Sequence, residues 1–442
     1  MRARPTVAPA TAWHFPDPLV SRLDNGLTLW SYRLPGQHVI TANLVFDLPL
    51  TAEPAGLEGI ATLAALGLDE GTENHPGETY SAALESQGAQ YSGWASLSAS
   101  TASLELPGQW FEPGLRLFAE AVQTPAYADE AVERLKSQRL ADLDQTRSNP
   151  RRLAGWLLRG TVLDPAQRAG RPLAGSRANV AAIQPEDVRR FQAERHTPDR
   201  ATLVVAGDID PQTVASAVTR IWGDWRGSGT APADHQPPLP GRPSRRLIDR
   251  PDAVQADIRL GWCGLDRSDR LWPAFKVAAA IMGDGFSSRL NQVLREDRGW
   301  TYDVSLAVRG FRLGGLVILG TSTKTETAAA ALAEAERITA GDAPAFSARE
   351  TADAIGWLTG VAPLSFSTAA AVADQAAGMV GLGFGPGQTD QSLRAIAQVT
   401  PDEATAAWRA VISRQSPSLV VVGPGDRLAE PLGLDPEPRP EL

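Results

Sequence analysis

The fold is decided by two short apolar stretches, Leu203-Val204-Val205-Ala206-Gly207 and Leu419-Val420-Val421-Val422-Gly423. An unbroken apolar run of this length, ending at a glycine, is typical of a strand that is buried on both faces of a sheet. The two runs are nearly identical and stand 216 residues apart, from Val205 to Val421. A similar pattern at so long an interval predicts that the chain contains two copies of one domain.

A second pair of landmarks agrees with the first. The segments 43–50 and 257–264 both have the pattern of a strand, and they are offset by 214 residues. Each is followed by an alanine-rich apolar stretch, 57–68 in the first half and 273–282 in the second, which favours a helix. Further strands are predicted at 90–97 and 101–106, before several helices. This partial segregation of strands from helices predicts an α+β fold in which each sheet carries helices on one face.

The middle of the chain separates the two copies. Residues 227–243 read GSGTAPADHQPPLPGRP, which is rich in glycine and proline and has no apolar period, so we predict a linker. The predicted parts are therefore an N-terminal domain at 1–226, the linker at 227–243, a C-terminal domain at 244–427 and a flexible tail at 428–442.

Composition excludes several classes of protein. The net charge of −9 argues against binding to nucleic acid or to an anionic membrane by general electrostatics. Cys263 is the one cysteine, so the chain can form neither an internal disulfide nor a cysteine zinc cluster. The sequence contains no run of about 18 apolar residues, so we predict no membrane span. Residues 1–19 lack the apolar core of a secretory signal. We therefore expect a cytoplasmic protein.

Residues 51–72 read TAEPAGLEGIATLAALGLDEGT. This segment resembles the zinc-binding segment of the pitrilysin/insulinase metallopeptidase family, in which an apolar helix carries H-x-x-E-H. The positions that correspond to histidine, glutamate and histidine are Thr62, Ala65 and Leu66 within the predicted helix 57–70. The flanking positions match the family: Ala55, Gly56, Gly59, Leu63, Gly71 and Thr72.

The replacements remove the chemistry of that motif. Two imidazoles at positions i and i+4 hold one zinc ion, and the glutamate acts as general base on the metal-bound water. Threonine, alanine and leucine can do neither. Asp142 is the best match to the family's third ligand, a glutamate on a later helix, but one carboxylate cannot hold zinc alone. No two histidines have ligand spacing among His14, His38, His75, His196 and His235. We therefore expect no metal or other cofactor on this chain.

A second segment, unlike the first, matches the same family at its functional positions. Residues 282–302 read MGDGFSSRLNQVLREDRGWTY, which resembles the same family's C-terminal signature: a glycine-rich turn, a helix, and a tyrosine that opens a strand. Arg295 and Tyr302 stand seven apart, as do the family's substrate-binding arginine and tyrosine. A tyrosine hydroxyl can stabilise the charge that develops on a peptide carbonyl, and an arginine can bind backbone carbonyls or a carboxylate. The glycines do not complete a phosphate-binding motif.

The resemblance covers nearly the whole chain and implies two homologous domains that form half of a clam-shell. It is closest to half-length bacterial members that pair as mitochondrial processing peptidase does, with zinc on one subunit and the arginine–tyrosine pair on the other. We therefore expect a non-catalytic, substrate-binding subunit of a heterodimeric zinc endopeptidase, with a homologous catalytic partner that carries H-x-x-E-H and zinc. Peptides, including leader peptides, are the implied substrates. A purely structural subunit and a stand-alone peptide-binding protein remain alternatives.

Overall fold

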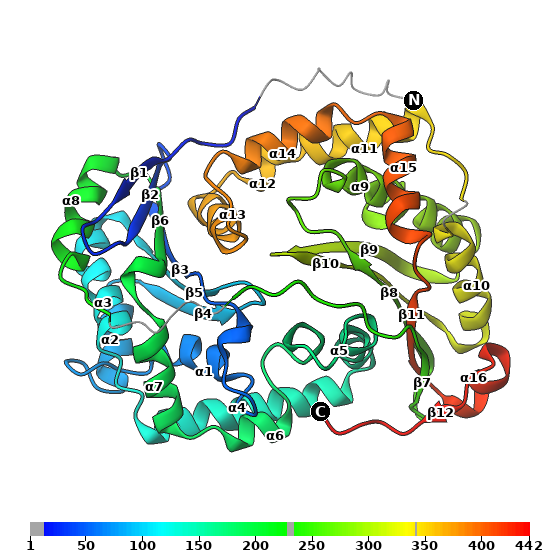
Figure 1. The fold of residues 1–442 in the computed structure, drawn as a ribbon, viewed down its shortest axis with the longest axis horizontal. Coiled ribbons are helices and arrows are strands. Elements are labelled where there is room, and N and C mark those ends of the chain that lie inside the picture. The colour runs from blue at the N-terminus through cyan, green and yellow to red at the C-terminus, as the bar shows by residue number, and fades with distance from the viewer. Residues whose placement is uncertain (1–12, 228–233, 341–342) are drawn as a thin grey trace, which may run out of the picture.

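The computed structural model describes residues 13–227, 234–340 and 343–442. Over these residues it contains two six-stranded sheets on opposite sides of the molecule (Figure 1). The first consists of β1 (Leu19–Arg22), β2 (Thr28–Arg33), β3 (Val39–Phe46), β4 (Gln90–Ala95), β5 (Ser100–Pro107) and β6 (Ala201–Gly207), in the order β1-β2-β6-β3-β5-β4. The second consists of β7 (Arg245–Asp249), β8 (Gln255–Gly264), β9 (Thr301–Phe311), β10 (Gly314–Lys324), β11 (Ser418–Gly423) and β12 (Pro436–Glu437), in the order β12-β7-β11-β8-β10-β9.

The duplication extends to the pairing of individual residues. Val204 on β6 lies opposite Trp30 on β2 and opposite Asn43 on β3. The three residues that follow these at an interval of 216 are paired in the same way: Val420, Arg246 and Arg259. The central strands of both halves therefore share one register, and the two homologous α+β domains predicted from the sequence are confirmed.

Helices follow the strands in both halves. Those of the first half are α1 (Ile60–Leu66), α2 (Glu78–Ser86), α3 (Phe111–Gln123), α4 (Asp129–Ser148), α5 (Pro150–Val162), α6 (Arg177–Ala182), α7 (Pro185–Arg195) and α8 (Pro211–Trp222). Those of the second half are α9 (Trp272–Ala279), α10 (Ala328–Thr339), α11 (Ala348–Gly360), α12 (Ala362–Ser365), α13 (Ala369–Gly381), α14 (Gln388–Ala397), α15 (Pro401–Ile412) and α16 (Gly425–Leu432).

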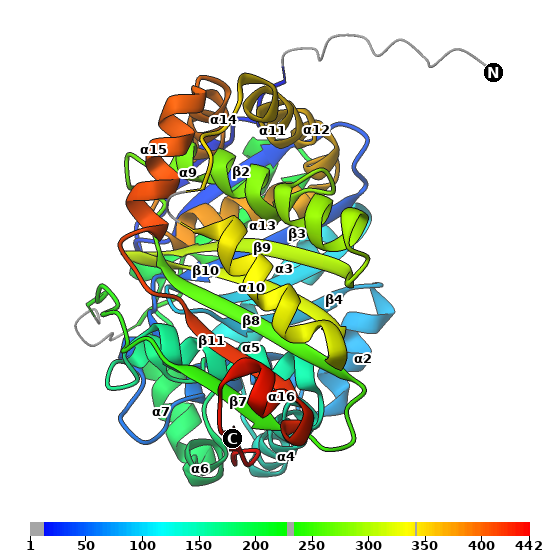
Figure 2. The same cartoon turned by 90° about the vertical axis from the view of Figure 1, so that its right-hand side faces the viewer.

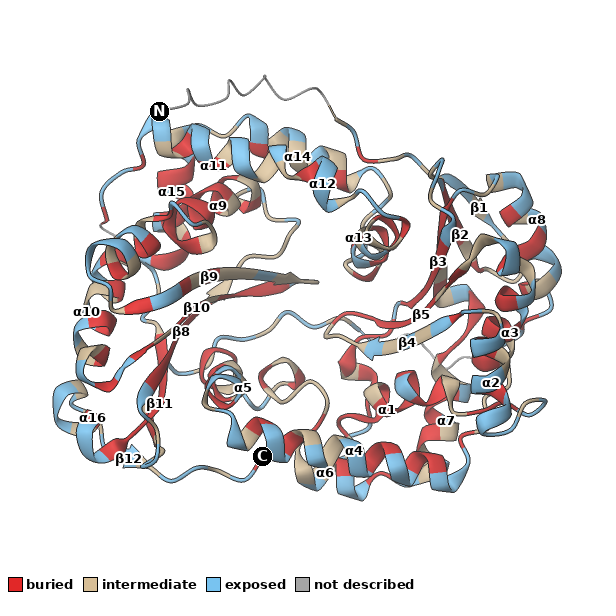
Figure 3. Cartoon of the chain, turned by 180° about the vertical axis from the view of Figure 1, so that it is seen from behind, coloured by how far each residue is buried: buried red, intermediate tan, exposed pale blue. Residues whose placement is uncertain are grey.

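Each sheet is covered on its outer face by helices of its own half. Leu203 and Val205 on β6 point into a core formed with α1, α3 and α8. In the second half, α9, α10 and α15 lie over the outer face (Figure 2). Figure 3 shows that buried residues are concentrated in the central strands and on the sides of these helices that face the sheets. Burial of each large apolar side chain contributes roughly 1.5–3 kcal/mol.

The inner faces are covered by helices exchanged between the halves, which the sequence did not predict. Val204 and Ala206 on β6 pack against α13, which belongs to the second half. Val420 and Val422 on β11 pack against Leu153, Leu157 and other residues of α5, which belongs to the first half. We expected helices on one face of each sheet only. Both faces of β6 and β11 are buried, which explains why their sequences are unbroken apolar runs.

The C-terminal segment differs from the prediction. Residues 428–442, expected to be a flexible tail, include most of α16 and all of β12, which pairs with β7. The last residue, Leu442, is 5% exposed, and its carbonyl accepts a hydrogen bond from Arg177 N at 2.8 Å. Arg147 Nε donates to the carbonyl of Pro440 at 3.0 Å. The proline-rich composition suggested fraying, but contacts with the first half order the segment.

The linker and one hairpin join the two halves. Residues 228–233 of the predicted linker lie outside the described residues, and the rest runs along the first half, where Gly241 N donates to Val162 O at 2.8 Å. Asp47 beside β3 accepts from His235 of the linker at 2.6 Å and from Arg312 of the β9–β10 hairpin at 2.9 Å. The hydrogen bond from His235 lowers the pKa of Asp47.

Within the described residues, none of the helices taken singly has both the length and the apolar character needed to cross a bilayer. One pair, Ala348–Ser365 with Ala369–Gly381, meets that test only when its members are counted together, and it is bent by 119° at the break.

Candidate functional site

The helix predicted at 57–70, without zinc ligands, is present as the shorter α1 (Ile60–Leu66), and its contacts are structural. Helix α1 starts after Gly59, whose φ of +106° requires glycine, and ends at Leu66. Of the three motif positions, Thr62 is half-buried, Ala65 is 1% exposed and Leu66 is 37% exposed. The hydroxyls of Tyr91 and Tyr127 donate to the last carbonyls of the helix, Ala65 O at 2.6 Å and Ala64 O at 2.7 Å.

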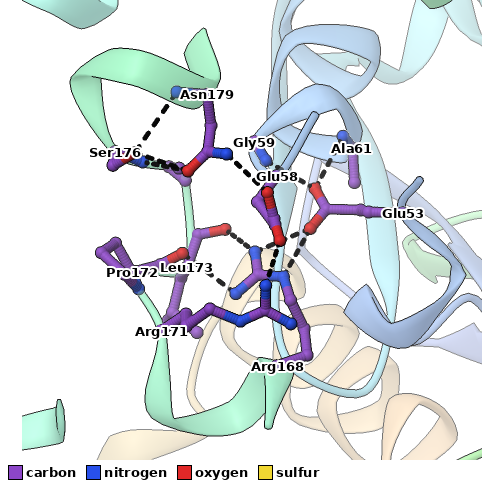
Figure 4. A network of polar contacts seen from close by, with 12 residues as sticks. Glu53, Glu58, Gly59, Ala61, Arg168, Arg171, Pro172, Leu173, Ser176 and Asn179 are labelled. Atoms are coloured by element: carbon purple, nitrogen blue, oxygen red, sulfur yellow. Dashed lines mark hydrogen bonds and ion pairs between the residues drawn. The ribbon is translucent and has the colours of Figure 1, made fainter. Parts of the chain in front are cut away.

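The start of α1 is held by a buried network of charged groups (Figure 4). One oxygen of Glu53 accepts from Gly59 N at 2.9 Å and from Ala61 N at 3.1 Å, and the other accepts from Arg168 at 2.7 Å. The remaining donors of Arg168 reach the carbonyls of Pro172 at 3.0 Å and Leu173 at 2.6 Å. Burial raises the pKa of Glu53, against the opposing effect of Arg168 and the two backbone amides.

A second ion pair extends this network. Glu58 contacts Arg171 and accepts from the Asn179 side chain at 2.6 Å, while Asn179 also donates to Gly56 O at 3.1 Å. Ser176 and Asn179 form a capping box at the start of α6 (Figure 4). Every charged group in the network has a partner, so the network fixes α1 against the loop before α6 and offers no free ligand.

Asp142 is also unsuited to metal binding. It lies on α4, where one carboxylate oxygen contacts Arg139 and the other contacts Arg152. In the part of the chain that the structure describes, no group of three or more His, Cys, Asp or Glu side chains could hold a metal ion. The residues at the motif positions therefore do not fit zinc, and no chemistry of a bound metal follows from this chain.

The second predicted segment has a different character. Two wide helical turns, Ala280–Asp284 and Asn291–Asp297, flank the glycine-rich turn, and such π-type turns are frequent at functional sites. Gly283 packs flat against β9, since an added Cβ would lie 2.6 Å from Leu306 Cβ. Asn291 ties the turn to β9 through hydrogen bonds to Gly285 O at 3.1 Å and Val304 O at 2.9 Å.

Two of the three arginines of this segment, Arg289 and Arg295, are in opposite situations. Arg289 donates to both oxygens of Glu350, at 2.7 and 3.1 Å, and to the carbonyls of Pro344 and Ala345. Its hydrogen bonds lower the pKa of Glu350 to about 2. Arg289 is thus fully used in holding the fold. Arg295 has one ion pair, with the adjacent Glu296 at 3.3 Å, and its side chain is 30% exposed.

The structure brings the predicted pair together. The Arg295 guanidinium carbon lies 5.4 Å from the centre of the Tyr302 ring and 4.4 Å from the centre of the Phe286 ring. The turn between the pair depends on Gly299, which has a φ of +62°. Stacking between a guanidinium and two aromatic rings limits the rotamers of Arg295. Its Nε faces Glu296, and its terminal N–H groups, which have no ion pair within the described residues, can bind a ligand.

Tyr302 is directed outward by a β-bulge. Thr321 of β10 pairs with Val304, but Thr323 pairs with Thr301, so β9 has one extra residue at Tyr302–Asp303. Tyr302 is 86% exposed and makes no hydrogen bond to the described residues. All five tyrosines lie in the described ranges, and the other four are buried or half-buried: Tyr32, Tyr80, Tyr91 and Tyr127.

Comparisons with known proteins agree with this description. Residues 182–350, which include Arg295 and Tyr302, match the model of the peptidase M16 inactive domain. An uncharacterized zinc protease of Streptomyces coelicolor is 30% identical over 58% of this chain, a match that spans 57% of that protein's length. Another, from Mycobacterium tuberculosis, is 25% identical over 94% of this chain and 96% of its own length.

By these matches the chain is similar to peptidases of the pitrilysin-like M16 family. Its fold agrees with a crystal structure of a peptidase M16 inactive domain from Pseudomonas fluorescens, with a TM-score of 0.84 at 21% identity over 96% of this chain and 99% of that one. A protease from Helicobacter pylori gives the same TM-score at 14% identity, over 93% of this chain and 100% of that one.

A groove of about 420 Å³ lies beside the exposed Tyr302. Its lining includes Arg151, Gln255, Trp300, Tyr302 and Asp303. Arg151 belongs to α5, the exchanged helix, and forms an ion pair with Asp303 at 3.7 Å. The helix exchange therefore brings a residue of the first half to the site of the second.

Sequence reasoning missed three features of the site. An aromatic residue in a glycine-rich turn, such as Phe286, cannot be told from a core residue by pattern alone. The bulge leaves no mark in the sequence, because threonine at positions 301 and 321 is common in any strand. The contribution of Arg151 depends on the exchange of α5, and no periodicity in the chain indicates an exchange.

Proposed function

We propose that this M16 chain is the non-catalytic, substrate-binding subunit of a two-chain zinc endopeptidase. The zinc ion and the activated water belong to a homologous partner that carries H-x-x-E-H. This chain supplies Arg295 and Tyr302 to the composite site. The match to an M16 inactive domain and the names of the relatives support the part of the proposal that concerns a non-catalytic member of a zinc protease family.

One observation carries the proposal: functional groups are available at one site and missing at the other. Among the residues that the structure describes, the exposed Tyr302 hydroxyl has no hydrogen-bond partner, and Arg295 beside it has an ion pair only with its neighbour in sequence. Positions 62, 65 and 66 offer no metal ligand and no base. A chain with donors for a transition state but no means of generating a nucleophile can act only together with another chain.

The roles of the pair follow from its chemistry. When a peptide carbonyl is attacked, negative charge develops on its oxygen, and the phenol of Tyr302 is placed to donate a hydrogen bond to it. The guanidinium of Arg295 binds backbone carbonyls or a carboxylate of the same peptide and so fixes its register. The adjacent groove has room for neighbouring peptide residues. The substrates are peptides, leader peptides among them, and we expect cleavage in the cytoplasm.

The test uses the complex purified after co-expression with its zinc-bearing partner, assayed on a fluorogenic peptide that the complex cleaves. We expect Tyr302→Phe to lower kcat by about 10²-fold, as loss of one oxyanion donor does, while size-exclusion chromatography shows unchanged assembly. Trp110→Phe, at a 39% exposed aromatic residue of the first half, is the matched control and should leave kcat unchanged.

The other outcomes favour the alternatives. Full turnover by the Tyr302→Phe complex would support a purely structural subunit and contradict the proposal. Tight binding of the peptide by the isolated chain, with no partner recovered from its own cell extract, would support a stand-alone peptide-binding protein.

A further inference from the structure

We propose that Thr301 and Thr321 are positioning residues for Tyr302, because their hydroxyls hold the β-bulge that turns the tyrosine out of the sheet. The catalytic part of this inference rests on the function proposed above. The structural part concerns this chain alone.

The bulge interrupts the ladder between β10 and the edge strand β9. Thr321 lies opposite Val304 and Thr323 lies opposite Thr301, so both Tyr302 and Asp303 face Ser322. An extra residue in one strand leaves backbone groups without their normal ladder partners. Since β9 is the edge strand of its sheet, no further strand of the described chain can satisfy them.

Two buried hydroxyls replace those partners. Asp303 N donates to Thr301 Oγ1 at 3.2 Å. Asp303 O lies 2.8 Å from Thr301 Oγ1 and 2.9 Å from Thr321 Oγ1, and Ser322 O lies 2.9 Å from Thr301 Oγ1. The two hydroxyls are themselves 2.8 Å apart. Each has one proton to donate, so the pair shares two protons among these acceptors and accepts the Asp303 amide.

The hydroxyls are shielded from water, so water cannot easily take their place. Thr301 is 9% exposed and Thr321 is 4% exposed, whereas Tyr302, the residue that follows Thr301, is 86% exposed. A buried backbone group that loses its partner carries a free-energy penalty, and the strand can avoid it by returning to a regular ladder. In a regular ladder, β9 would have no extra residue opposite Ser322. The register of β9 would shift, and the Tyr302 side chain would point in another direction.

Mutations that remove one hydroxyl while keeping the shape test the inference. Thr301→Val deletes the shared hydroxyl, and Thr301→Ser restores it. Thr339→Val is the matched control, because this buried threonine of α10 donates to Ala335 O at 2.7 Å, far along the chain from the bulge.

The first readout needs no partner. Hydrogen–deuterium exchange of the full chain, followed on peptides that cover residues 300–305, should be at least tenfold faster in Thr301→Val. We expect wild-type exchange in this segment for Thr301→Ser and for Thr339→Val. Unchanged exchange in Thr301→Val would overturn the claim that the hydroxyls hold the bulge.

The second readout is the kinetics of the assembled complex. Since Thr301 acts through Tyr302, Thr301→Val should lower kcat about tenfold and change KM less than twofold, and Thr301→Ser should recover most of kcat. In the Tyr302→Phe background, the same substitution should have no further effect on kcat. The positioning role would be overturned if Thr301→Val speeds exchange but leaves kcat unchanged, while Tyr302→Phe lowers kcat of the same complex.

The two failures can be distinguished. If Tyr302→Phe itself leaves turnover intact, the proposed function fails, and the catalytic part of this inference fails with it. The exchange measurement still decides whether Thr301 and Thr321 hold the bulge.

Discussion

The helix α1 and the segment from Phe286 to Tyr302 are the two landmarks of this chain, and they are built in opposite ways. Around α1, buried side chains satisfy both ends of the helix, and each charged group in the network has a partner. Around Tyr302, the chain exposes a phenol, a guanidinium and an aromatic ring to solvent. The first region stabilises the fold, and the second offers hydrogen-bond donors to a ligand.

This difference indicates that α1 needs no metal to keep its position. Thr62, Ala65 and Leu66 lie on a helix whose start is held by Glu53 and Arg168. The helix persists because its neighbours, rather than a metal, hold it. If that is correct, substitutions in the first region should affect stability, and substitutions in the second should affect function.

The largest effect should come from the buried ion pair. Arg168→Met leaves the Glu53 carboxylate buried without its cation, and we expect the free energy of unfolding to fall by roughly 3–5 kcal/mol. Urea denaturation followed by circular dichroism measures it.

The matched substitution in the second region is Arg295→Met, which removes the same charge from a partly exposed site. We expect a loss of about 1 kcal/mol or less, the order of magnitude of an exposed contact between a guanidinium and aromatic rings. Equal losses in the two variants would remove the distinction between the regions.

Acid should weaken the first region selectively. His196, at the end of α7, is 3% exposed and stacks on Phe46 at 4.3 Å, and burial lowers its pKa from 6.5 to about 4. The unfolded chain therefore takes up a proton near pH 6.5, while the folded chain resists it until about pH 4. The contribution to stability is complete above pH 6.5 and is lost as the pH falls towards 4, by roughly 2–3 kcal/mol between pH 7 and 4.5.

Comparison of variants isolates this effect from other titrating groups. The loss of stability between pH 7 and 4.5 should be smaller by roughly 2–3 kcal/mol in His196→Phe, which has no titrating side chain. His196→Gln should show the same reduction and serves as the second variant if the phenyl ring disturbs packing. An identical pH dependence in wild type and both variants would show that His196 does not carry it.

Substrate binding should depend on Arg295. A hydrogen bond to a charged group contributes roughly 1.5 kcal/mol or more, so Arg295→Met should raise KM of the complex about tenfold with a smaller change in kcat. Arg298→Met removes a nearby exposed guanidinium that lies over Trp300 and serves as the control. A KM unchanged in Arg295→Met would remove Arg295 from the site.

The smallest effect should come from Phe286, which covers one side of the Arg295 guanidinium and is 67% exposed. We expect Phe286→Ala to raise KM by two- to fivefold, in keeping with a contribution of about 0.5–1 kcal/mol from the lost stacking. Phe286→Trp should keep the contact and the wild-type KM. A larger loss in Phe286→Ala than in Arg295→Met would mean that the ring itself binds substrate.

Much of the fold follows from local patterns. The apolar runs at β6 and β11 predicted two copies of one domain, and the paired strands confirm it at the level of single residues. Helix α5 spans Pro150–Val162, and its location on the other sheet was not predictable. A periodic apolar face indicates that a helix packs against something, but not which sheet it packs against.

The candidate site was predictable where it depends on residue identity. That positions 62, 65 and 66 carry no metal-binding side chain is read directly from the sequence, and the structure places Arg295 beside Tyr302 as their spacing led us to expect. The bulge at Tyr302–Asp303 and the role of Thr301 depend on strand register, which local sequence specifies weakly at an edge strand. The ordered C-terminal segment was mispredicted because its partners lie nearly 300 residues earlier, at Arg147 and Arg177.

The most direct test of the account is the zinc content of the purified chain after equilibration with excess zinc and removal of unbound metal, measured together with peptide hydrolysis. We expect far less than one zinc ion per chain and no hydrolysis that a chelator abolishes. One tightly bound zinc ion per chain, with chelator-sensitive cleavage by the chain alone, would contradict it.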